Sequence, residues 1–166
     1  MVSYQGTFEF FDNRFLAPSE VLPTLPPKII TYPKDSIMYY LEQYHPKFAF
    51  IAKKAKMDWY LASESLRSTL FLPTDESISE SILLNLDINT SRRIIKYHLM
   101  SGLFPSYVLK TSPYQELFTT IKGSSITWIM YSDSEIYLNN QIPILSMDHY
   151  YNNGIIHIIQ EMMIYS

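Results

Sequence analysis

Apolar residues recur at intervals of three and four early in the chain, at Ile37, Tyr40, Leu41 and Tyr44. This spacing predicts one face of a helix, which Asp35 or Ser36 can cap. A second helix is expected to begin at Pro46, a residue that suits the first turn of a helix, and to run to about residue 56. Residues 57–66 predict a further short helix or turn.

A short strand and two more helices are predicted next. Residues 69–72 form an apolar run that Pro73 ends, which is typical of a buried strand. Thr74 is then expected to cap a helix that has carboxylates in its first turn. One of the polar residues 89–91 should cap the following helix, which would continue past residue 98 and stop at Gly102.

After Pro113 the hydrophobic period shifts towards two, which predicts strands. The expected strands are residues 117–121, 125–131, 135–138, 142–145 and 155–164, separated by Ser-Asp, Asn-Asn and Asn-Gly turns. Since helices come first and strands later, the sequence predicts an α+β fold.

The last of these turns, Asn153-Gly154, leads into an Ile-rich run that contains His157. Asn and Gly tolerate the positive φ angles of a tight turn. The run that follows predicts a strand buried on both faces. Within it, His157 should share a face with Ile155 and Ile159, as a residue of the core or of its edge.

Residues 1–33 differ from the rest of the chain and contain five of its ten prolines. Because proline fixes φ and lacks a backbone N–H, an extended or irregular arm is expected. The arm is too apolar for a solvated linker, so it should lie on its own domain or on a neighbouring protein. Its candidate partner-binding residues are Phe8, Phe10, Phe11, Phe15 and Leu16. Residues 34–166 would then form the folded domain.

Composition narrows the classes of function. The chain has 166 residues, 47% of them hydrophobic, which suits one globular domain. A net charge of −3 without a basic stripe argues against nucleic acid as a partner. The lack of cysteine excludes disulfides and the usual zinc sites. Neither a secretory signal nor an apolar run of membrane-spanning length is visible in the sequence.

Three segments, in order, match the signatures of one family. Residues 68–78, STLFLPTDESI, resemble the first signature of fasciclin-like domains, a strand followed by a Pro-Thr turn. Residues 94–102, IIKYHLMSG, resemble their central Tyr-His motif, and residues 153–163, NGIIHIIQEMM, resemble their closing signature. Residues 117–123 look like one of the family's strands. The resemblance extends over roughly residues 34–165.

The resemblance implies a fasciclin-like fold, in which a bundle of short helices lies beside a β-wedge of antiparallel or mixed strands. It also implies a role in adhesion or protein–protein association. One departure is Asn139-Asn140, which stands where the mid-sheet hairpin of the family usually has Asn-Gly. Because Asn tolerates left-handed backbone geometry, the turn is expected to survive.

The same resemblance indicates candidate partner-binding residues. Tyr97 and His98 match the Tyr-His motif, which contributes to receptor binding in some relatives. A buried His98 that hydrogen-bonds the backbone is the alternative. Asp148 matches the acid of an Asp-Ile pair that is implicated in integrin contact, but His149 replaces the apolar partner, which argues against integrin binding.

Catalytic and metal chemistry find little support. No phosphate loop, nucleophile elbow or zinc-protease motif occurs, so no enzyme, catalytic residue or cofactor is predicted. Asp148, His149 and His157 are suitable metal ligands by type but follow no recognised spacing, so no metal site is predicted. Asn89 begins the one N-glycosylation sequon, which matters only if the chain is secreted; helix capping is the other interpretation of these residues.

Two hypotheses for function follow, and both take other proteins as partners. The first is a minor capsid or virion protein of a large DNA virus that cements neighbouring subunits through the domain and the apolar arm. It rests on the arm, on the absence of a visible secretion signal, and on abundant Ile and Tyr, which are residues of AT-rich codons. The alternative is an adhesion module of the fasciclin type, secreted or at the cell surface.

Overall fold

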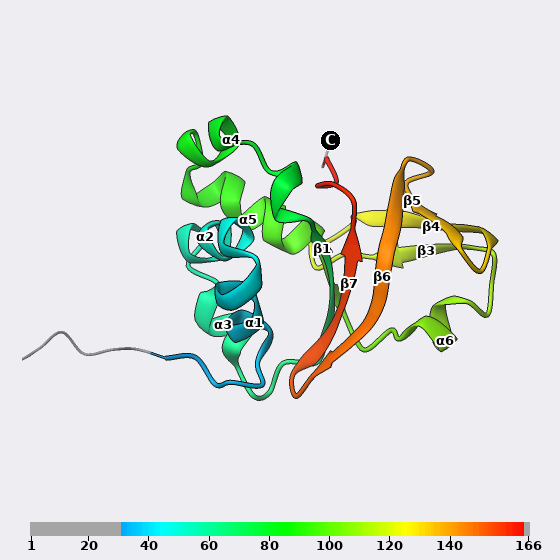
Figure 1. Ribbon diagram of the computed structural model, residues 1–166, viewed down its shortest axis with the longest axis horizontal. Coiled ribbons are helices and arrows are strands. Elements are labelled where there is room, and N and C mark those ends of the chain that lie inside the picture. Colours follow the sequence, from blue (N-terminus) through cyan, green and yellow to red (C-terminus); the bar gives the residue numbers. More distant parts are fainter. Residues whose placement is uncertain (1–30, 165–166) are drawn as a thin grey trace, which may run out of the picture. The chain divides into compact units, whose positions relative to one another are not determined.

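The computed structural model describes residues 31–164 and places the helices before most of the strands (Figure 1). The helices are α1 Ile37–Tyr44, α2 Pro46–Lys54, α3 Asp58–Ala62, the 3-10 helix η1 Asp75–Ser77, α4 Glu80–Leu84, α5 Ile88–Tyr97 and α6 Ser106–Leu109. The strands are β1 Ser68–Pro73, β2 Leu99–Ser101, β3 Tyr114–Phe118, β4 Ser125–Ser132, β5 Glu135–Leu138, β6 Ile142–Tyr151 and β7 Gly154–Ile159. The predicted α+β class is confirmed.

The strands form one mixed sheet in the order β2-β1-β7-β6-β5-β4-β3. β1 and β7, which are far apart in the sequence, pair in parallel with Leu70 opposite Ile156. Both strands are buried along almost their whole length. They therefore appear in the sequence as continuous apolar runs rather than as alternating patterns. The prediction of a strand buried on both faces after Asn153 is confirmed.

Two hydrophobic clusters lie on the two faces of these central strands. The first cluster contains Leu70 and Leu72 of β1 together with buried residues of α1, α2, α3 and α5. The second contains Phe71 of β1 together with Trp128 and other buried residues of β3–β6. Since successive side chains of a strand point to opposite faces, β1 joins both clusters. Figure 1 shows the helices α1–α5 on one side of β1 and β7, and β3–β5 with α6 on the other.

Capping explains where two of the helices begin. Ser36 caps α1 as predicted, and its hydroxyl accepts the Tyr39 N–H at 3.2 Å. The prediction that one of residues 89–91 caps α5 is wrong, because the carboxylate of Asp87 accepts the Thr90 N–H at 2.7 Å and starts the helix earlier. An aspartate ahead of the polar run satisfies the free N–H groups of the first turn, so the residues after it become helical.

The predicted end of α5 and the predicted start of the helix after β1 are also wrong. α5 stops at Tyr97, and the strand β2 follows it, so Gly102 does not terminate a helix. Thr74 precedes only the 3-10 helix η1, and the helix α4 begins later, with Ser79 as its cap. After Tyr97 the chain pairs with β1, and η1 is held against α2, where the Asp75 carboxylate accepts the Lys47 N–H at 3.1 Å. In both places tertiary contacts override the local helical pattern.

The strand boundaries also differ from the prediction. β3 lies earlier than residues 117–121, and β7 is shorter than residues 155–164. β6 is longer than predicted because two register shifts, between Ile144 and Ser146 and between Ser146 and His149, let it continue through polar residues. Such bulges break the alternating pattern on which the prediction relied. The four-residue helix α6 was not predicted, since it is too short for a helical period.

Asn139 and Asn140 form the turn between β5 and β6. Both have φ near 54°, and the Gln141 N–H donates to the Leu138 carbonyl at 3.1 Å. Two consecutive positive φ angles in a closed turn are the geometry of a type I′ hairpin. The prediction that Asn would keep this turn in place of Asn-Gly is confirmed.

We expect an Asn140→Gly variant to gain about 0.5 kcal/mol in unfolding free energy, because glycine carries no steric cost at positive φ. This gain outweighs the loss of the exposed bond that Asn140 accepts from the Tyr131 hydroxyl at 2.8 Å. Urea denaturation followed by circular dichroism would measure the gain. Asn139→Gly is the matched control: the Asn139 side chain accepts the Thr127 N–H at 3.0 Å and donates to the Tyr97 hydroxyl at 3.3 Å. The control should therefore be destabilised, and a loss of stability in both variants would contradict the turn assignment.

The predicted arm lies almost entirely outside the described residues. At its end, the Tyr32 hydroxyl donates to the Asp58 carboxylate at 2.7 Å, and its ring lies 4.7 Å from that of Trp59. What the rest of the arm contacts stays a prediction, as does the domain boundary at residue 34. In the part of the chain that is described, no helix is long and apolar enough to cross a membrane.

Candidate functional site

Asn153, at the turn between β6 and β7, is buried and uses its whole amide group inside the fold. Its Oδ1 accepts the Ile37 N–H at 3.0 Å. Its Nδ2 donates to the carbonyls of Leu61 at 2.8 Å and Ser63 at 3.0 Å. One side chain therefore connects the sheet to the first turn of α1 and to the end of α3, where backbone groups lack partners within their own helix.

The prediction that Asn153 and Gly154 provide positive φ angles is wrong, since neither residue has one. Gly154 is required for a different reason. A Cβ atom at this position would lie 2.4 Å from the Ser68 carbonyl oxygen and 2.7 Å from Cδ1 of Ile37. Only glycine allows β1 and α1 to approach the start of β7 this closely.

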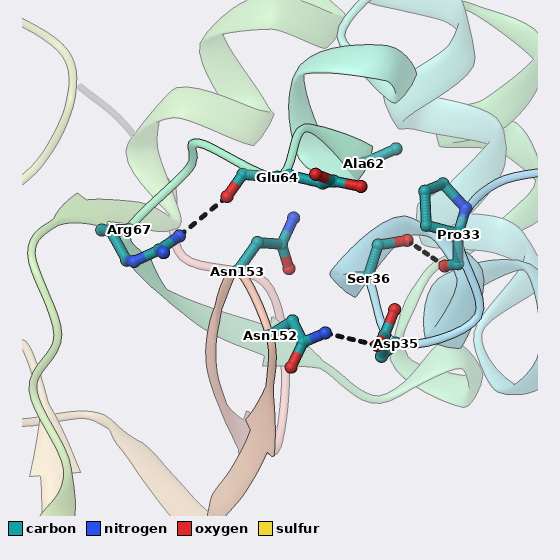
Figure 2. Close-up of a pocket in the computed structure, with 8 residues that line it drawn as sticks. All are labelled: Pro33, Asp35, Ser36, Ala62, Glu64, Arg67, Asn152 and Asn153. Carbon is teal, nitrogen blue, oxygen red and sulfur yellow. Dashed lines mark hydrogen bonds between the residues drawn. The ribbon is translucent and has the colours of Figure 1, made fainter.

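A polar pocket of about 400 Å³ opens beside Asn153, and Figure 2 shows its lining: Pro33, Asp35, Ser36, Ala62, Glu64, Arg67, Asn152 and Asn153. Its polar groups are largely bonded to each other and to the backbone. Asn152 donates to the carboxylate of Asp35, and the Arg67 guanidinium donates to the carbonyl of Glu64 at 2.9 Å. These groups hold loops in place, and none of them pairs a nucleophile with a base.

His98 is fully buried at the C-terminal end of α5. Its Nδ1–H donates to the Ile94 carbonyl at 2.8 Å, which leaves Nε2 to accept the Met163 N–H at 2.9 Å. Burial lowers the pKa of His98 to about 4, although the hydrogen bond to Ile94 opposes this shift. The alternative prediction of a buried histidine bonded to the backbone is confirmed. Tyr97, next to it, is also buried, and its hydroxyl accepts a hydrogen bond from Asn139.

His157 is buried in β7 and is likewise bonded through both ring nitrogens. Its Nε2–H donates to the Phe104 carbonyl at 2.8 Å, and its Nδ1 accepts the Asp148 N–H at 3.1 Å. Burial lowers the pKa of His157, while the bond to Phe104 and the nearby Asp148 oppose the shift. Both histidines are thus held as neutral imidazoles with a fixed tautomer.

Asp148 lies at the bulge in β6, with φ of 68°. Its carboxylate accepts the Ser106 N–H at 2.8 Å and also the Ser106 hydroxyl. Partial burial raises the pKa of Asp148, but the two bonds from Ser106, together with His157 and Lys110, outweigh it and leave the pKa lowered. The acid that the resemblance singled out therefore fastens the start of α6 to β6.

Structure brings some of the candidate residues together and separates others. Asp148 and His157 are in contact, whereas Tyr97 and His98 lie at the end of α5. The ring nitrogens of His157 are occupied, and Nε2 of His149 is 2.7 Å from the Ser146 hydroxyl. Within residues 31–164 no group of three His, Cys, Asp or Glu side chains is placed to hold a metal ion.

A family model of the Fasciclin domain matches residues 43–165. The chain belongs to the fasciclin domain family. The predicted fasciclin-like fold is confirmed, and fasciclin domains are in general adhesion and protein-interaction modules rather than catalysts. A search of curated proteins gave no match.

Among solved structures, the chain is similar to a FAS1 domain pair from the insect cell adhesion molecule fasciclin I, with a TM-score of 0.65 and 19% sequence identity. The match covers 80% of this chain and 52% of the other, so this chain spans about half the length of that structure. At this identity the likeness shows the shared fold.

Two predictions about candidate residues of the fasciclin chain stay untested. Asn89 is exposed in the first turn of α5, and it does not cap that helix. Its glycosylation stays a prediction. Phe8, Phe10, Phe11, Phe15 and Leu16 lie outside the described residues, so their role in partner binding also stays a prediction.

Sequence reasoning missed a set of large exposed side chains on the wedge of this fasciclin domain. Tyr114 and Phe118 of β3 are 60% and 68% exposed, and Tyr131 of β4 is 63% exposed. A partial signal was present, because Tyr114, Phe118 and Tyr131 stand at the alternate positions where a strand with one buried face usually has polar residues. Buried Leu117 and Trp128 lie on one face, and exposed aromatic residues lie on the other.

Proposed function

We propose that this chain is a non-enzymatic adhesion module that binds other proteins outside the cell or at a cell surface. The observation that supports this function is which side chains are buried and which are exposed. The polar atoms of His98, His157 and Asn153 form hydrogen bonds to the backbone inside the fold, while large aromatic side chains are exposed at the surface. Exposed aromatic side chains are the residues that dominate protein–protein contacts.

The same side chains argue against catalysis. A general base needs a free nitrogen or oxygen within reach of a substrate proton. Both nitrogens of His98 and of His157 are bonded to the backbone, and the carboxylate of Asp148 is bonded to Ser106. The titratable side chains of the family motifs therefore stabilise the fold through these hydrogen bonds.

The virion hypothesis finds no support in the fold or in the comparisons, and the adhesion alternative is the better supported of the two. Cementing of capsid subunits depends on the arm before residue 31, outside the described residues. Adhesion agrees with the family to which residues 43–165 belong and with the fold shared with an insect adhesion molecule.

Cell attachment to surfaces coated with the full chain tests this function. We expect attachment to rise with coating density and to saturate. The same chain unfolded in urea before coating, at the same density, is the control, because binding by a folded surface should be lost with the fold. Equal attachment to both coatings, or none to the folded chain, would overturn the proposal.

A further inference from the structure

β3 is the last strand in the order of the sheet formed by residues 31–164. In an antiparallel pair, residues alternate between those that bond to the partner strand and those whose backbone groups point away from it. The Pro113 carbonyl accepts the Met130 N–H at 2.9 Å, and the Thr119 N–H donates to Ser124 at 3.0 Å. By alternation, Tyr114, Glu116 and Phe118 direct their N–H and C=O groups away from β4.

The two ends of this edge are already partly covered. The Ser112 hydroxyl donates to the Tyr114 carbonyl at 2.8 Å. At the other end the Thr120 N–H donates to the Leu99 carbonyl at 2.9 Å, and Met100 of β2 forms a bridge with Thr119. The open part of the edge is therefore centred on Glu116, which can both donate and accept a backbone hydrogen bond.

The surface next to this edge is apolar and aromatic. Tyr114, Ile129 and Tyr137 lie directly opposite one another across β3, β4 and β5. Phe118 and Tyr131 are exposed on the same face, and the Tyr131 ring lies 5.9 Å from that of Tyr137. We call this the outer face; its positions are Tyr114, Glu116, Phe118, Ser125, Thr127, Ile129, Tyr131, Glu135 and Tyr137.

The charge of the outer face is acidic. Glu116 and Glu135 contribute carboxylates, and no lysine or arginine occupies any of its positions. A cation set on it would face both carboxylates and aromatic rings, and guanidinium groups bind well to each of these. β3 contains no lysine, proline or bulge that would block pairing. Its central charge, Glu116, disfavours an acidic or purely apolar partner strand and favours one with a cation opposite it.

We propose that β3 binds an extended, basic segment of a partner protein as an added strand of the sheet, with an arginine or lysine opposite Glu116 and an apolar residue opposite Tyr114. The segment ends before Phe118, because the register of the Met100–Thr119 bridge places Ser101 of β2 opposite that residue. This inference rests on the proposed adhesion function and specifies its binding surface. Backbone hydrogen bonds at Glu116 supply the strand register, and the outer face selects alternate side chains of the segment.

A second copy of this chain is the poorer occupant. Glu116 is the middle residue of Tyr114–Phe118, so a two-fold symmetric pairing of two β3 strands would place two Glu116 carboxylates directly opposite each other. Like charges at opposite positions destabilise a strand pair. Residues 7–11 of the chain itself contain no lysine or arginine to place opposite Glu116, so they lack the charge that this surface would select.

Titration of the full chain with the peptide Thr-Arg-Thr-Val-Thr, which in an antiparallel pairing places Arg opposite Glu116 and Val opposite Tyr114, tests the inference when followed by NMR. We expect saturable binding with chemical-shift changes in β3, β4 and β5. Glu116→Lys should weaken binding of this peptide about fivefold and strengthen binding of the same peptide with Glu in place of Arg. N-methylation of the arginine amide should abolish binding, because it removes a backbone donor. Glu161→Lys, an equal change of charge after β7, should have no effect.

Failure of the arginine peptide to bind, or binding that Glu116→Lys does not alter, would overturn strand addition at β3. A dimer in sedimentation experiments that Glu116→Lys disrupts would make a second copy the occupant instead. The cell-attachment assay distinguishes failure of strand addition at β3 from failure of the proposed adhesion function. Attachment without peptide binding leaves the adhesion function standing, whereas absence of attachment to the wild-type coating contradicts that function itself.

Discussion

An Asn153→Ala variant should lose about 4 kcal/mol of unfolding free energy. Alanine leaves the Ile37 N–H and the Leu61 carbonyl without their partners inside the fold, and the Ser63 carbonyl keeps only its bond from the Leu66 N–H at 3.3 Å. Each buried polar group that loses its partner costs about 1–3 kcal/mol. Because the three groups belong to α1 and to the end of α3, the loss should separate the helices from the turn before β7. Urea denaturation at neutral pH would measure it.

Two matched variants make this prediction specific. Asn153→Asp keeps the acceptor for the Ile37 N–H, but it buries an ionised oxygen against the carbonyls of Leu61 and Ser63, so its stability at neutral pH should fall by at least as much as that of the alanine variant. Asn152→Ala, one residue earlier, removes only an exposed bond to Asp35 and should cost less than about 1 kcal/mol. If Asn152→Ala and Asn153→Ala were equally stable, the amide of Asn153 would not be the connection that we describe.

The second large effect expected is a loss of stability in mild acid that originates at His98. Protonation of Nε2 would replace the acceptor of the Met163 N–H by a second donor in a fully buried site. Burial holds the pKa of His98 at about 4 in the folded chain, whereas an unfolded histidine has a pKa of about 6.5. Between these values the unfolded state binds more protons than the folded state.

The direction of the pH dependence follows from this difference. The contribution of His98 is fully present above pH 6.5 and is lost as the pH falls from about 6.5 to about 4, and it amounts to roughly 3 kcal/mol. Burial also lowers the pKa values of His157 and His45, so they add to the loss in the same direction. The carboxylate of Asp148, whose pKa is lowered, loses its contribution only at more acidic pH.

Urea denaturation at pH 7 and at pH 4.5 would measure this effect. A His98→Gln variant is the control: it should be less stable than the wild type at pH 7, but it should lose less free energy between the two pH values. The protection of the Met163 amide from hydrogen exchange, relative to its intrinsic rate at each pH, should fall in the wild type over the same range. Equal pH dependence of the two proteins would show that His98 does not titrate as described.

Each of these predictions concerns a residue of a family motif, and this bears on function. The Tyr-His and Asn-Gly motifs supply bonds between distant segments, so their substitution should lower adhesion only by unfolding the domain. Residues of the outer face, such as Phe118 and Glu116, should instead alter binding without changing stability, because their side chains are exposed. Comparing attachment with stability across these variants would distinguish the two kinds of residue.

The sequence by itself determined the α+β class, the starts of α1 and α2, the strands β1 and β5 and the turn at Asn139-Asn140. All of these depend on short-range physics: the spacing of apolar residues, capping by Ser36, and the tolerance of Asn for positive φ. Similarity of three segments to the fasciclin family extended this to the whole fold. Capping of α5 by Asp87 was also local, but the polar run after it gave several equivalent candidates.

Only the tertiary structure decided what the polar motif residues do. Partners of Asn153 in α1 and α3 come from the other end of the domain, and His98 meets Met163 beyond β7. Gly154 is required by the approach of Ser68 in a parallel strand, not by its own backbone angle. The open edge at Glu116 likewise exists because β3 is the last strand in the order of the sheet. Local sequence patterns report propensity, whereas these roles depend on which distant atoms the folded chain brings within a few ångströms of one another.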